Sequence, residues 1–219
     1  MKERKPRFAV VLSGCGVFDG SEIHEAVLTM LAIARQRGEY VCFAPDVPQK
    51  QTIDHLTKRE TAESRNILAE AARIARGRIA PLADFDASEF DALVFPGGFG
   101  AAKNLSTFAF DGPRCTVDPY VESAIAAMRE ARKPIGAMCI APVLLAKTLA
   151  GVEVTIGRDS ETAGALEKMG ARHVNAGPVE VVVDARNQIA TTPCYMLDSD
   201  IAQVAQGAEN LIKALLAMM

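Results

Sequence analysis

The sequence predicts an α/β protein with a three-layer sandwich architecture, in which helices cover both faces of a mostly parallel sheet. Short apolar runs without a helical period alternate with amphipathic segments along most of the chain. Glycines and other turn-forming residues follow several of these runs. The 219 residues, 49% of them apolar, fit a single domain over residues 1–219. We therefore expect a ligand site beyond the carboxyl ends of the strands.

The predicted strands are apolar runs, several of them rich in β-branched residues. They cover residues 8–12, 40–44, 91–95, 134–138 and 152–156. A hairpin is predicted at residues 179–184 and 188–192, joined through the turn at 185–187. Because helices separate most of the other strands, those strands should pair in parallel with right-handed crossovers.

The predicted helices carry apolar residues at helical spacing. The first begins after Asp19 or Ser21, either of which can cap it, and ends before Gly38. The others are predicted over residues 61–75, 117–132, 143–149, 161–169 and 201–216. The polar, proline-containing stretch 45–58 is predicted to be a long loop.

Cys139 comes at the end of the apolar run 134–138 and directly before a predicted helix. A residue on such a strand-to-helix turn lies above the sheet edge and faces the amide groups of the helix, as in a nucleophile elbow. Pro142 suits the first turn of that helix, where its missing N–H leaves no bond unmade. The positive end of a helix favours a thiolate. Cys139 is thus either a nucleophile or one more buried small hydrophobe.

A second informative stretch is Pro96-Gly-Gly-Phe-Gly-Ala-Ala102, which follows the strand at 91–95. Consecutive glycines permit positive φ and let bare backbone N–H groups approach a ligand. A plain turn is the alternative for this stretch alone. On the predicted topology it meets the loop at 13–21 and the Cys139 turn at one edge of the sheet.

Charge and cysteine content exclude several classes of function. The net charge is -3, and basic residues are scattered, so no segment suggests a nucleic acid or an anionic membrane as partner. Five cysteines without a CxxC pattern fit neither a disulfide framework nor a zinc site. No apolar run approaches the length of a membrane span or of a signal peptide's middle region. We therefore expect a cytoplasmic protein without a metal or other cofactor.

Three segments together carry a family resemblance. They are residues 12–28, which begin Leu-Ser-Gly-Cys-Gly-Val-Phe-Asp-Gly-Ser-Glu-Ile-His-Glu, the loop and following residues 96–105, and the segment Thr191-Thr-Pro-Cys-Tyr-Met-Leu197. With Ala137-Met-Cys-Ile-Ala-Pro142 they resemble the glyoxalase III, deglycase and intracellular-protease superfamily, and within it the branch called enhancing lycopene biosynthesis protein 2, or isoprenoid biosynthesis glyoxalase. The resemblance covers nearly the whole chain. It implies a flavodoxin-like, class I glutamine amidotransferase-like fold and a homodimer.

The resemblance also implies roles for individual residues. Cys139 matches the nucleophile, and Glu25 matches the acid whose carboxyl hydrogen-bonds the nucleophilic sulfur. A protonated carboxyl there would stabilise the thiolate. The backbone amides of Gly98 and Ile140 match the oxyanion pocket, with Gly97 beside them.

The family's histidine is missing from this chain. Many members have a histidine directly after the nucleophile or near the position of Gly157, and here Ile140 and Gly157 occupy these places. His24 and His55 are possible bases instead, although successive helix residues point about 100° apart, so His24 and Glu25 face one sulfur only if the helix end is irregular. His173 is expected to be structural.

The resemblance implies a cofactor-free glyoxalase III-type lyase that converts methylglyoxal or a related 2-oxoaldehyde to a 2-hydroxy acid, with Cys139 as its nucleophile. Without an assured histidine the enzyme should be slow. The alternative is a non-catalytic, redox-responsive or metabolite-binding protein that affects isoprenoid metabolism through Cys139. A glutaminase is disfavoured because no His-x-Glu pair occurs. Dinucleotide binding is disfavoured because Asp19 stands where the fingerprint has its third glycine.

Overall fold

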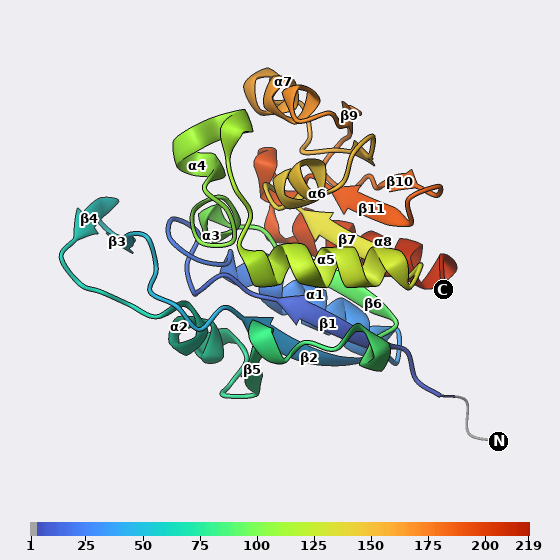
Figure 1. Ribbon diagram of the computed structural model, residues 1–219, viewed down its shortest axis with the longest axis horizontal. Helices are drawn as coiled ribbons and strands as arrows, with labels where there is room; N and C mark the ends of the chain where they lie inside the picture. The colour runs from blue at the N-terminus through green and yellow to red at the C-terminus, as the bar shows by residue number, and fades with distance from the viewer. Residues whose placement is uncertain (1–3) are drawn as a thin grey trace.

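The computed structural model describes residues 4–219 and shows a seven-stranded sheet in the order β10-β11-β7-β6-β1-β2-β5 (Figure 1). The strands are β1 (Arg7–Val11), β2 (Glu39–Ala44), β5 (Ile79–Pro81), β6 (Ala92–Phe95), β7 (Ile135–Met138), β10 (Val182–Asp184) and β11 (Ile189–Thr192). All neighbours pair in parallel except β10 and β11, which form the predicted antiparallel hairpin. The predicted fold class is confirmed.

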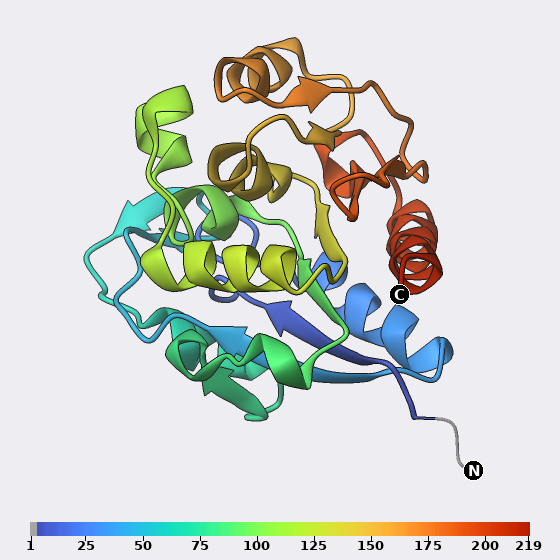
Figure 2. The same ribbon diagram turned by 45° about the vertical axis from the view of Figure 1, so that its right-hand side comes forward.

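Helices cover the sheet on both faces, as Figure 2 shows. One face packs against α1 (Ile23–Arg35), α2 (Ile67–Ile74) and α8 (Ile201–Ala217), and the other against α3 (Phe99–Lys103), α5 (Pro119–Glu130) and α6 (Pro142–Thr148). Alternate residues of β1 serve the two layers: Phe8 and Val10 join the first core, and Ala9 and Val11 the second. This division follows from the period of two along a strand. The two hydrophobic cores therefore lie on opposite faces of the same sheet.

Smaller elements lie outside the central sheet. The segment 45–58 was expected to be a loop, but it contains β3 (Thr52–Asp54), which forms a hairpin with β4 (Arg59–Thr61). The predicted strand at 152–156 shortens to β8 (Glu153–Val154), which pairs with β9 (Arg172–His173) in a separate two-stranded sheet beside β10 and β11. The short α4 (Phe108–Asp111) and α7 (Ser160–Lys168) flank α6 in Figure 1.

Two predicted helix starts are wrong. α2 begins at Ile67 rather than at residue 61, because Asn66 caps it by accepting a hydrogen bond from the N–H of Ala69 (2.9 Å). α1 is capped by Glu22, whose carboxylate accepts from the N–H of Glu25 (2.7 Å). The residues expected to cap α1 bind elsewhere: Asp19 accepts from Ile53, and Ser21 accepts from Ser13.

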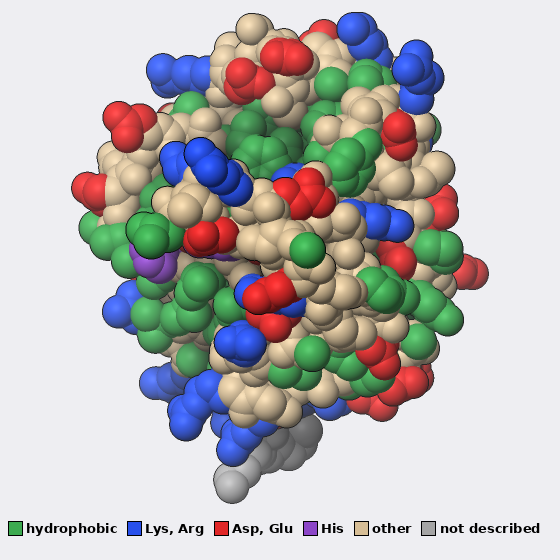
Figure 3. Space-filling model, turned by 90° about the vertical axis from the view of Figure 1, so that its left-hand side faces the viewer, with side chains coloured by type: hydrophobic (Ala, Val, Ile, Leu, Met, Phe, Trp, Pro, Cys, Tyr) green, Lys and Arg blue, Asp and Glu red, His purple; other side chains and the backbone are tan. Residues whose placement is uncertain are grey.

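The strands that build the site all end at the same edge of the sheet, on the left in Figure 1. Figure 3 views the molecule from that side and shows apolar, acidic and basic side chains mixed on its surface. Within residues 4–219 no helix has both the length and the apolar character needed to cross a membrane. The same part of the chain contains no group of three or more His, Cys, Asp or Glu side chains arranged to hold a metal ion.

Candidate active site around Cys139

Cys139 occupies the predicted turn between a strand and a helix. β7 ends at Met138, and α6 begins at Pro142. The backbone of Cys139 has φ of 59°, in the left-handed region that non-glycine residues seldom adopt. Its N–H donates to the carbonyl of Thr192 at the end of the neighbouring strand β11 (3.0 Å). The residue is only 7% exposed, so the turn holds the thiol inside the molecule and not on its surface.

The carboxyl group of Glu25 lies beside this thiol. Glu25 is in the first turn of α1, fully buried, and hydrogen-bonded to the side chain of Cys139. The N–H of Gly97 donates to Oε2 of Glu25 (3.0 Å), and the N–H of Tyr195 donates to Oε1 (3.1 Å). Three loops that end strands β6, β7 and β11 therefore converge on one carboxyl group.

Glycines at 97 and 98 make this approach possible. A Cβ on Gly97 would overlap the Cβ of Cys139 and Oε2 of Glu25. Gly98 has φ of 99°, and a Cβ there would overlap backbone atoms of Gly20 and Glu22. The glycine-rich loop is thus needed for close packing of backbone against the thiol and the carboxyl, as its position after β6 suggested.

The two amides expected to form an oxyanion pocket point at the sulfur. The backbone N–H groups of Gly98 and Ile140 both hydrogen-bond Cys139 and act to lower the pKa of its thiol. An oxygen bonded to a carbon that the sulfur had attacked would lie near the same two donors. The structure brings five of the predicted residues together: Cys139, Glu25, Gly97, Gly98 and Ile140.

Electrostatics differ from the expectation of a ready thiolate. Burial raises the pKa of Cys139 well above the ordinary range of a thiol, and the neighbouring Glu25 charge acts in the same direction. Burial also raises the pKa of Glu25 to about 8, although the N–H groups of Tyr195 and Gly97 oppose this. At neutral pH the carboxyl is therefore mostly protonated, and the desolvation of the sulfur outweighs the two amides and the short helix α6.

The first loop locks onto the glycine-rich loop through backbone hydrogen bonds. The N–H of Glu22 donates to the carbonyl of Gly97 (2.9 Å), and the N–H of Phe99 donates to that of Val17 (2.8 Å). The side-chain amide of Asn104 donates to the carbonyls of Ser13 and Asp19 (2.9 and 2.7 Å). The predicted meeting of these loops at one sheet edge is confirmed.

His24 is exposed and faces away from the buried carboxyl of its neighbour Glu25. Its Nδ1 lies 2.9 Å from the hydroxyl of Tyr195. α1 is regular from Ile23 onward, so adjacent residues diverge as helix geometry requires. Tyr195 itself had no predicted role, although its main-chain N–H binds Glu25. The only signal for it was its place in the segment 191–197, one of the segments that carried the family resemblance.

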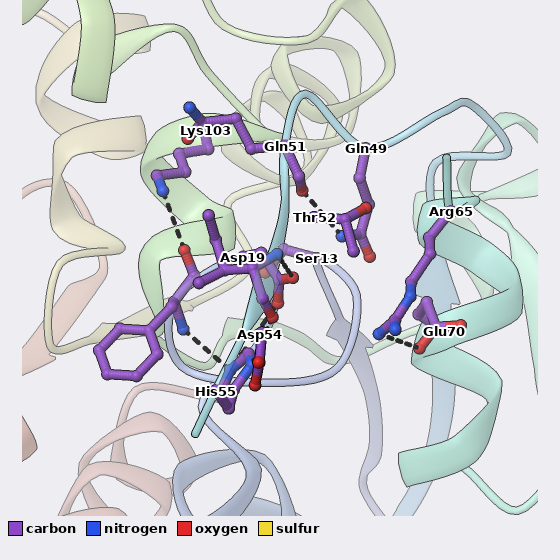
Figure 4. A network of polar contacts seen from close by, with 12 residues as sticks. Ser13, Asp19, Gln49, Gln51, Thr52, Asp54, His55, Arg65, Glu70 and Lys103 are labelled. Carbon is purple, nitrogen blue, oxygen red and sulfur yellow. Dashed lines mark hydrogen bonds and ion pairs between the residues drawn. The ribbon is translucent and has the colours of Figure 1, made fainter. Parts of the chain in front are cut away.

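His55 lies on the hairpin tip over the first loop, as Figure 4 shows. The N–H of Phe18 donates to its Nε2 (3.2 Å), so Nδ1 carries the proton and donates to the carbonyl of Ile53 (3.0 Å). Asp19 is buried and accepts from the N–H of Ile53 (2.7 Å), while its other oxygen lies 3.8 Å from Nε2 of His55. These contacts attach the β3–β4 hairpin to the first loop. Within residues 4–219, none of the contacts of His55 is with Cys139.

His173 binds the backbone near Gly157. Its Nε2 accepts from the N–H of Ile156 (3.3 Å), and burial lowers the pKa of the imidazole. A neutral ring that accepts a main-chain hydrogen bond has a structural role here, as expected. Among the described residues, Glu25 is therefore the ionisable group that contacts the thiol. His24 and His55, the two histidines proposed as bases, contact other groups.

Comparison with known proteins identifies the relatives of this chain. No protein-family model matches it. It is 48% identical to "ES1 protein homolog, mitochondrial" from Rattus norvegicus, over 98% of this chain and 84% of that protein. It is also 48% identical to the human "Glutamine amidotransferase-like class 1 domain-containing protein 3, mitochondrial", over 97% and 83% of the two chains. The chain belongs to the ES1 protein family.

Solved structures agree with this assignment. The fold is shared with the crystal structure of an isoprenoid biosynthesis protein with an amidotransferase-like domain from Ehrlichia chaffeensis. The two sequences are 41% identical, and the structures superpose with a TM-score of 0.91 over 97% of this chain and 99% of the Ehrlichia chain. A ThiJ/PfpI domain protein from Brachyspira murdochii, 16% identical with a TM-score of 0.60 over 98% and 99% of the chains, shares the fold alone.

The names of the ES1 relatives correct the expected location. Both the rat and the human protein are named mitochondrial, which points to a mitochondrial and not a cytoplasmic location. The expectation rested on unpaired cysteines, which indicate a reducing environment. More than one compartment provides such an environment, so cysteine content could not distinguish between them.

Proposed function

We propose that this ES1-family chain is a cofactor-independent glyoxalase, in which Cys139 adds to methylglyoxal or a related 2-oxoaldehyde. The observation that carries the proposal is the contact between the buried carboxyl of Glu25 and the thiol of Cys139, next to the amides of Gly98 and Ile140. The resemblance to the glyoxalase III and deglycase superfamily supports the same chemistry. A nucleophile, a proton acceptor and two oxyanion donors are the parts that thiol addition to an aldehyde needs.

The first step is the addition of sulfur to the aldehyde carbon. As the S–C bond forms, the thiol proton passes to the carboxylate of Glu25, and the carbonyl oxygen becomes an oxyanion that the two amides bind. With its pKa raised to about 8, Glu25 is suited to accept this proton, because a base is most effective when its pKa is near the working pH. Glu25 then returns this proton to the oxyanion, which gives a hemithioacetal on Cys139 and restores the carboxylate for the next step.

The second step moves hydrogen from C1 to C2 through an enediol. A base removes the C1 proton, the electron pair shifts toward C2, and a proton returns to C2, which leaves a 2-hydroxyacyl thioester. Glu25 or a water carries these protons. Water then adds to the thioester carbon, and the C–S bond breaks to release a 2-hydroxy acid and the thiol. The sum is one 2-oxoaldehyde plus one water giving one 2-hydroxy acid, with no external oxidant or reductant.

The raised pKa of Cys139 suggests that catalysis is slow. Few molecules hold a thiolate at neutral pH, so addition depends on proton transfer to Glu25 at the moment of attack. The redox-responsive alternative gains less support. Oxidation of a thiol by peroxide also needs the thiolate and access to solvent, and the 7% exposure of Cys139 limits that access.

The test is lactate formation from methylglyoxal by the purified full chain. We expect Cys139→Ala to abolish it and Cys42→Ala to retain most of it. Cys42 is a suitable control because it is also buried but lies in β2, where its thiol contacts Met30 of α1 and not the site. Equal turnover by wild type and Cys139→Ala would refute the proposal, as would a wild-type protein that forms no lactate at any pH between 6 and 10.

A further inference from the structure

A groove lies at the opposite end of the molecule from Cys139. It has a volume of about 430 Å³ and runs between the end of α5 and the turn that joins β10 to β11. Its lining contains four cationic side chains, Arg129, Arg132, Lys133 and Arg186, and one acidic side chain, Glu130. The sequence separates Arg186 from the other three by more than fifty positions, and the fold brings them together. We call this feature the basic groove.

The arginines of the basic groove have no counter-ion in the described part of the chain. Arg129, Arg132 and Arg186 are exposed, and no hydrogen bond or ion pair of their side chains occurs within residues 4–219. Lys133 donates to the carbonyl of Ala87 (2.7 Å) and forms no ion pair within residues 4–219, although its charge helps to lower the pKa of Asp86 nearby.

The acids near the groove do not neutralise it. The charge of Arg129 acts on the buried Asp184, but the oxygens of that carboxylate accept from Asn187 and from the N–H of Glu153. Glu130 is exposed and takes part in no ion pair among residues 4–219. Four positive charges therefore face one negative charge in the lining.

A polar atom in the lining has no partner. Oε1 of Gln188 is buried and without a hydrogen bond among the described residues. Unsatisfied buried polar atoms are uncommon, and each of them calls for a physical explanation such as a missing partner. Gln188 lines the groove, but its unpartnered oxygen is itself buried, so the positive side chains and not this oxygen carry the case for a ligand.

Helix ends explain only part of this arrangement. Cations near the last turn of a helix offset its partial negative charge, and Arg129 and Arg132 lie at the end of α5. Arg186 belongs to the turn between β10 and β11, so its charge does not offset that of a helix end. Like charges that share a groove repel each other, and a bound anion would remove this repulsion. The C-terminal end of α5 carries a partial negative charge of about one half, which by itself disfavours anions. The total positive charge of the groove's side chains is larger than this partial charge.

We propose that the basic groove binds a small, multiply charged oxyanion, namely the phosphate or diphosphate group of a small molecule. Guanidinium groups match the oxygens of phosphate with paired hydrogen bonds. A groove of about 430 Å³ is within the usual size of a small-molecule site. This binding does not depend on the glyoxalase proposal, because it involves none of the residues around Cys139.

The test is calorimetric titration of the full chain with inorganic pyrophosphate at low salt. We expect binding that the double variant Arg129→Gln, Arg186→Gln weakens at least about tenfold, since each lost charged hydrogen bond contributes on the order of a factor of ten. The matched control is Arg114→Gln, Arg158→Gln, which removes two exposed arginines outside the groove that form no ion pair within residues 4–219. It should bind within about twofold of wild type.

Three results would overturn the proposal. They are the absence of pyrophosphate binding by the wild type, an equal loss in the control, and tighter binding of a single-stranded oligonucleotide than of pyrophosphate. A further titration with glycerol phosphate and inorganic phosphate separates the two sources of the group. Either order of affinity supports a phosphate site, and tighter glycerol phosphate indicates an organic ligand.

Discussion

The carboxyl of Glu25 and the thiol of Cys139 are hydrogen-bonded in a buried space that three loops enclose. Burial raises the pKa values of both groups, so ionisation of one depends on the state of the other. Below the pKa of Glu25 the carboxyl can donate to sulfur, and above it the thiol can donate to the carboxylate. The pair therefore has a carboxyl proton that titrates near pH 8, whereas an ordinary carboxyl has already lost its proton at neutral pH.

Folding stability should depend on pH through Glu25. Its pKa is about 8 in the folded protein against 4.5 for an ordinary carboxyl, so the folded state binds more protons between these values. The stabilisation is fully present below pH 4.5 and is lost as pH rises toward 8, by on the order of a few kcal/mol. Urea unfolding at intervals from pH 5 to 9 measures this slope. In Glu25→Gln the slope should flatten, and a wild type whose stability rises over that range would contradict the expected sign.

The rate of lactate formation should rise with pH through about 8. At pH 7 only about a tenth of the molecules hold the Glu25 carboxylate that accepts the thiol proton, so kcat/KM should increase up to tenfold per unit below that value. The charge of Glu22 raises the pKa of Glu25. Glu22→Gln, which keeps an oxygen to cap α1, should move the midpoint of the profile to lower pH. A profile that is flat from pH 6 to 8 would argue against Glu25 as the proton acceptor.

Gly97→Ala should be strongly destabilising and inactive. Its methyl group would overlap the side chains of Cys139 and Glu25, both held in place by backbone hydrogen bonds. We expect a loss of about 3 kcal/mol or more in the free energy of unfolding. Gly164→Ala in α7 is the control, because a Cβ there meets no atom within 4 Å and alanine favours the helix by about 0.5–1 kcal/mol. Thermal or urea unfolding distinguishes the two.

The histidines should contribute little to catalysis. His24 contacts Tyr195, and His55 contacts Phe18 and Ile53. We expect His24→Gln and His55→Gln to keep kcat within about threefold of wild type, whereas loss of a catalytic base typically lowers the rate about 10²–10⁴-fold. A hundredfold loss in either variant, with the fold intact by circular dichroism, would mean that the ring moves to the thiol during turnover.

Several elements could be read from the sequence for clear physical reasons. The run at 134–138 is apolar and short, Cys139 follows it, and proline suits the start of the next helix, so β7, the turn and α6 were all predictable. The β3–β4 hairpin was missed because its strands, Thr52–Asp54 and Arg59–Thr61, are short and mostly polar. Its attachment depends on tertiary hydrogen bonds to Asp19 and Phe18, which local sequence does not encode.

The site was only partly predictable. Cys139, Glu25 and the amides of Gly98 and Ile140 came from motif and resemblance, and the structure brings them together. The ionisation of Cys139 was not predictable, because it depends on how much protein surrounds the sulfur. Sequence shows the helix start that would lower the thiol pKa, but it does not show the burial that raises it. The role of Tyr195 is likewise set by its backbone N–H and not by its side chain.

Only 7% of Cys139 is open to solvent, and this sets a size limit on what reaches its sulfur. We expect a bulky disulfide such as glutathione disulfide to reach this sulfur far more slowly than a molecule of a few atoms does. The same restriction would slow the formation of mixed disulfides that block the thiol of Cys139. For the slow glyoxalase that we propose, such protection would keep the thiol available over many turnovers.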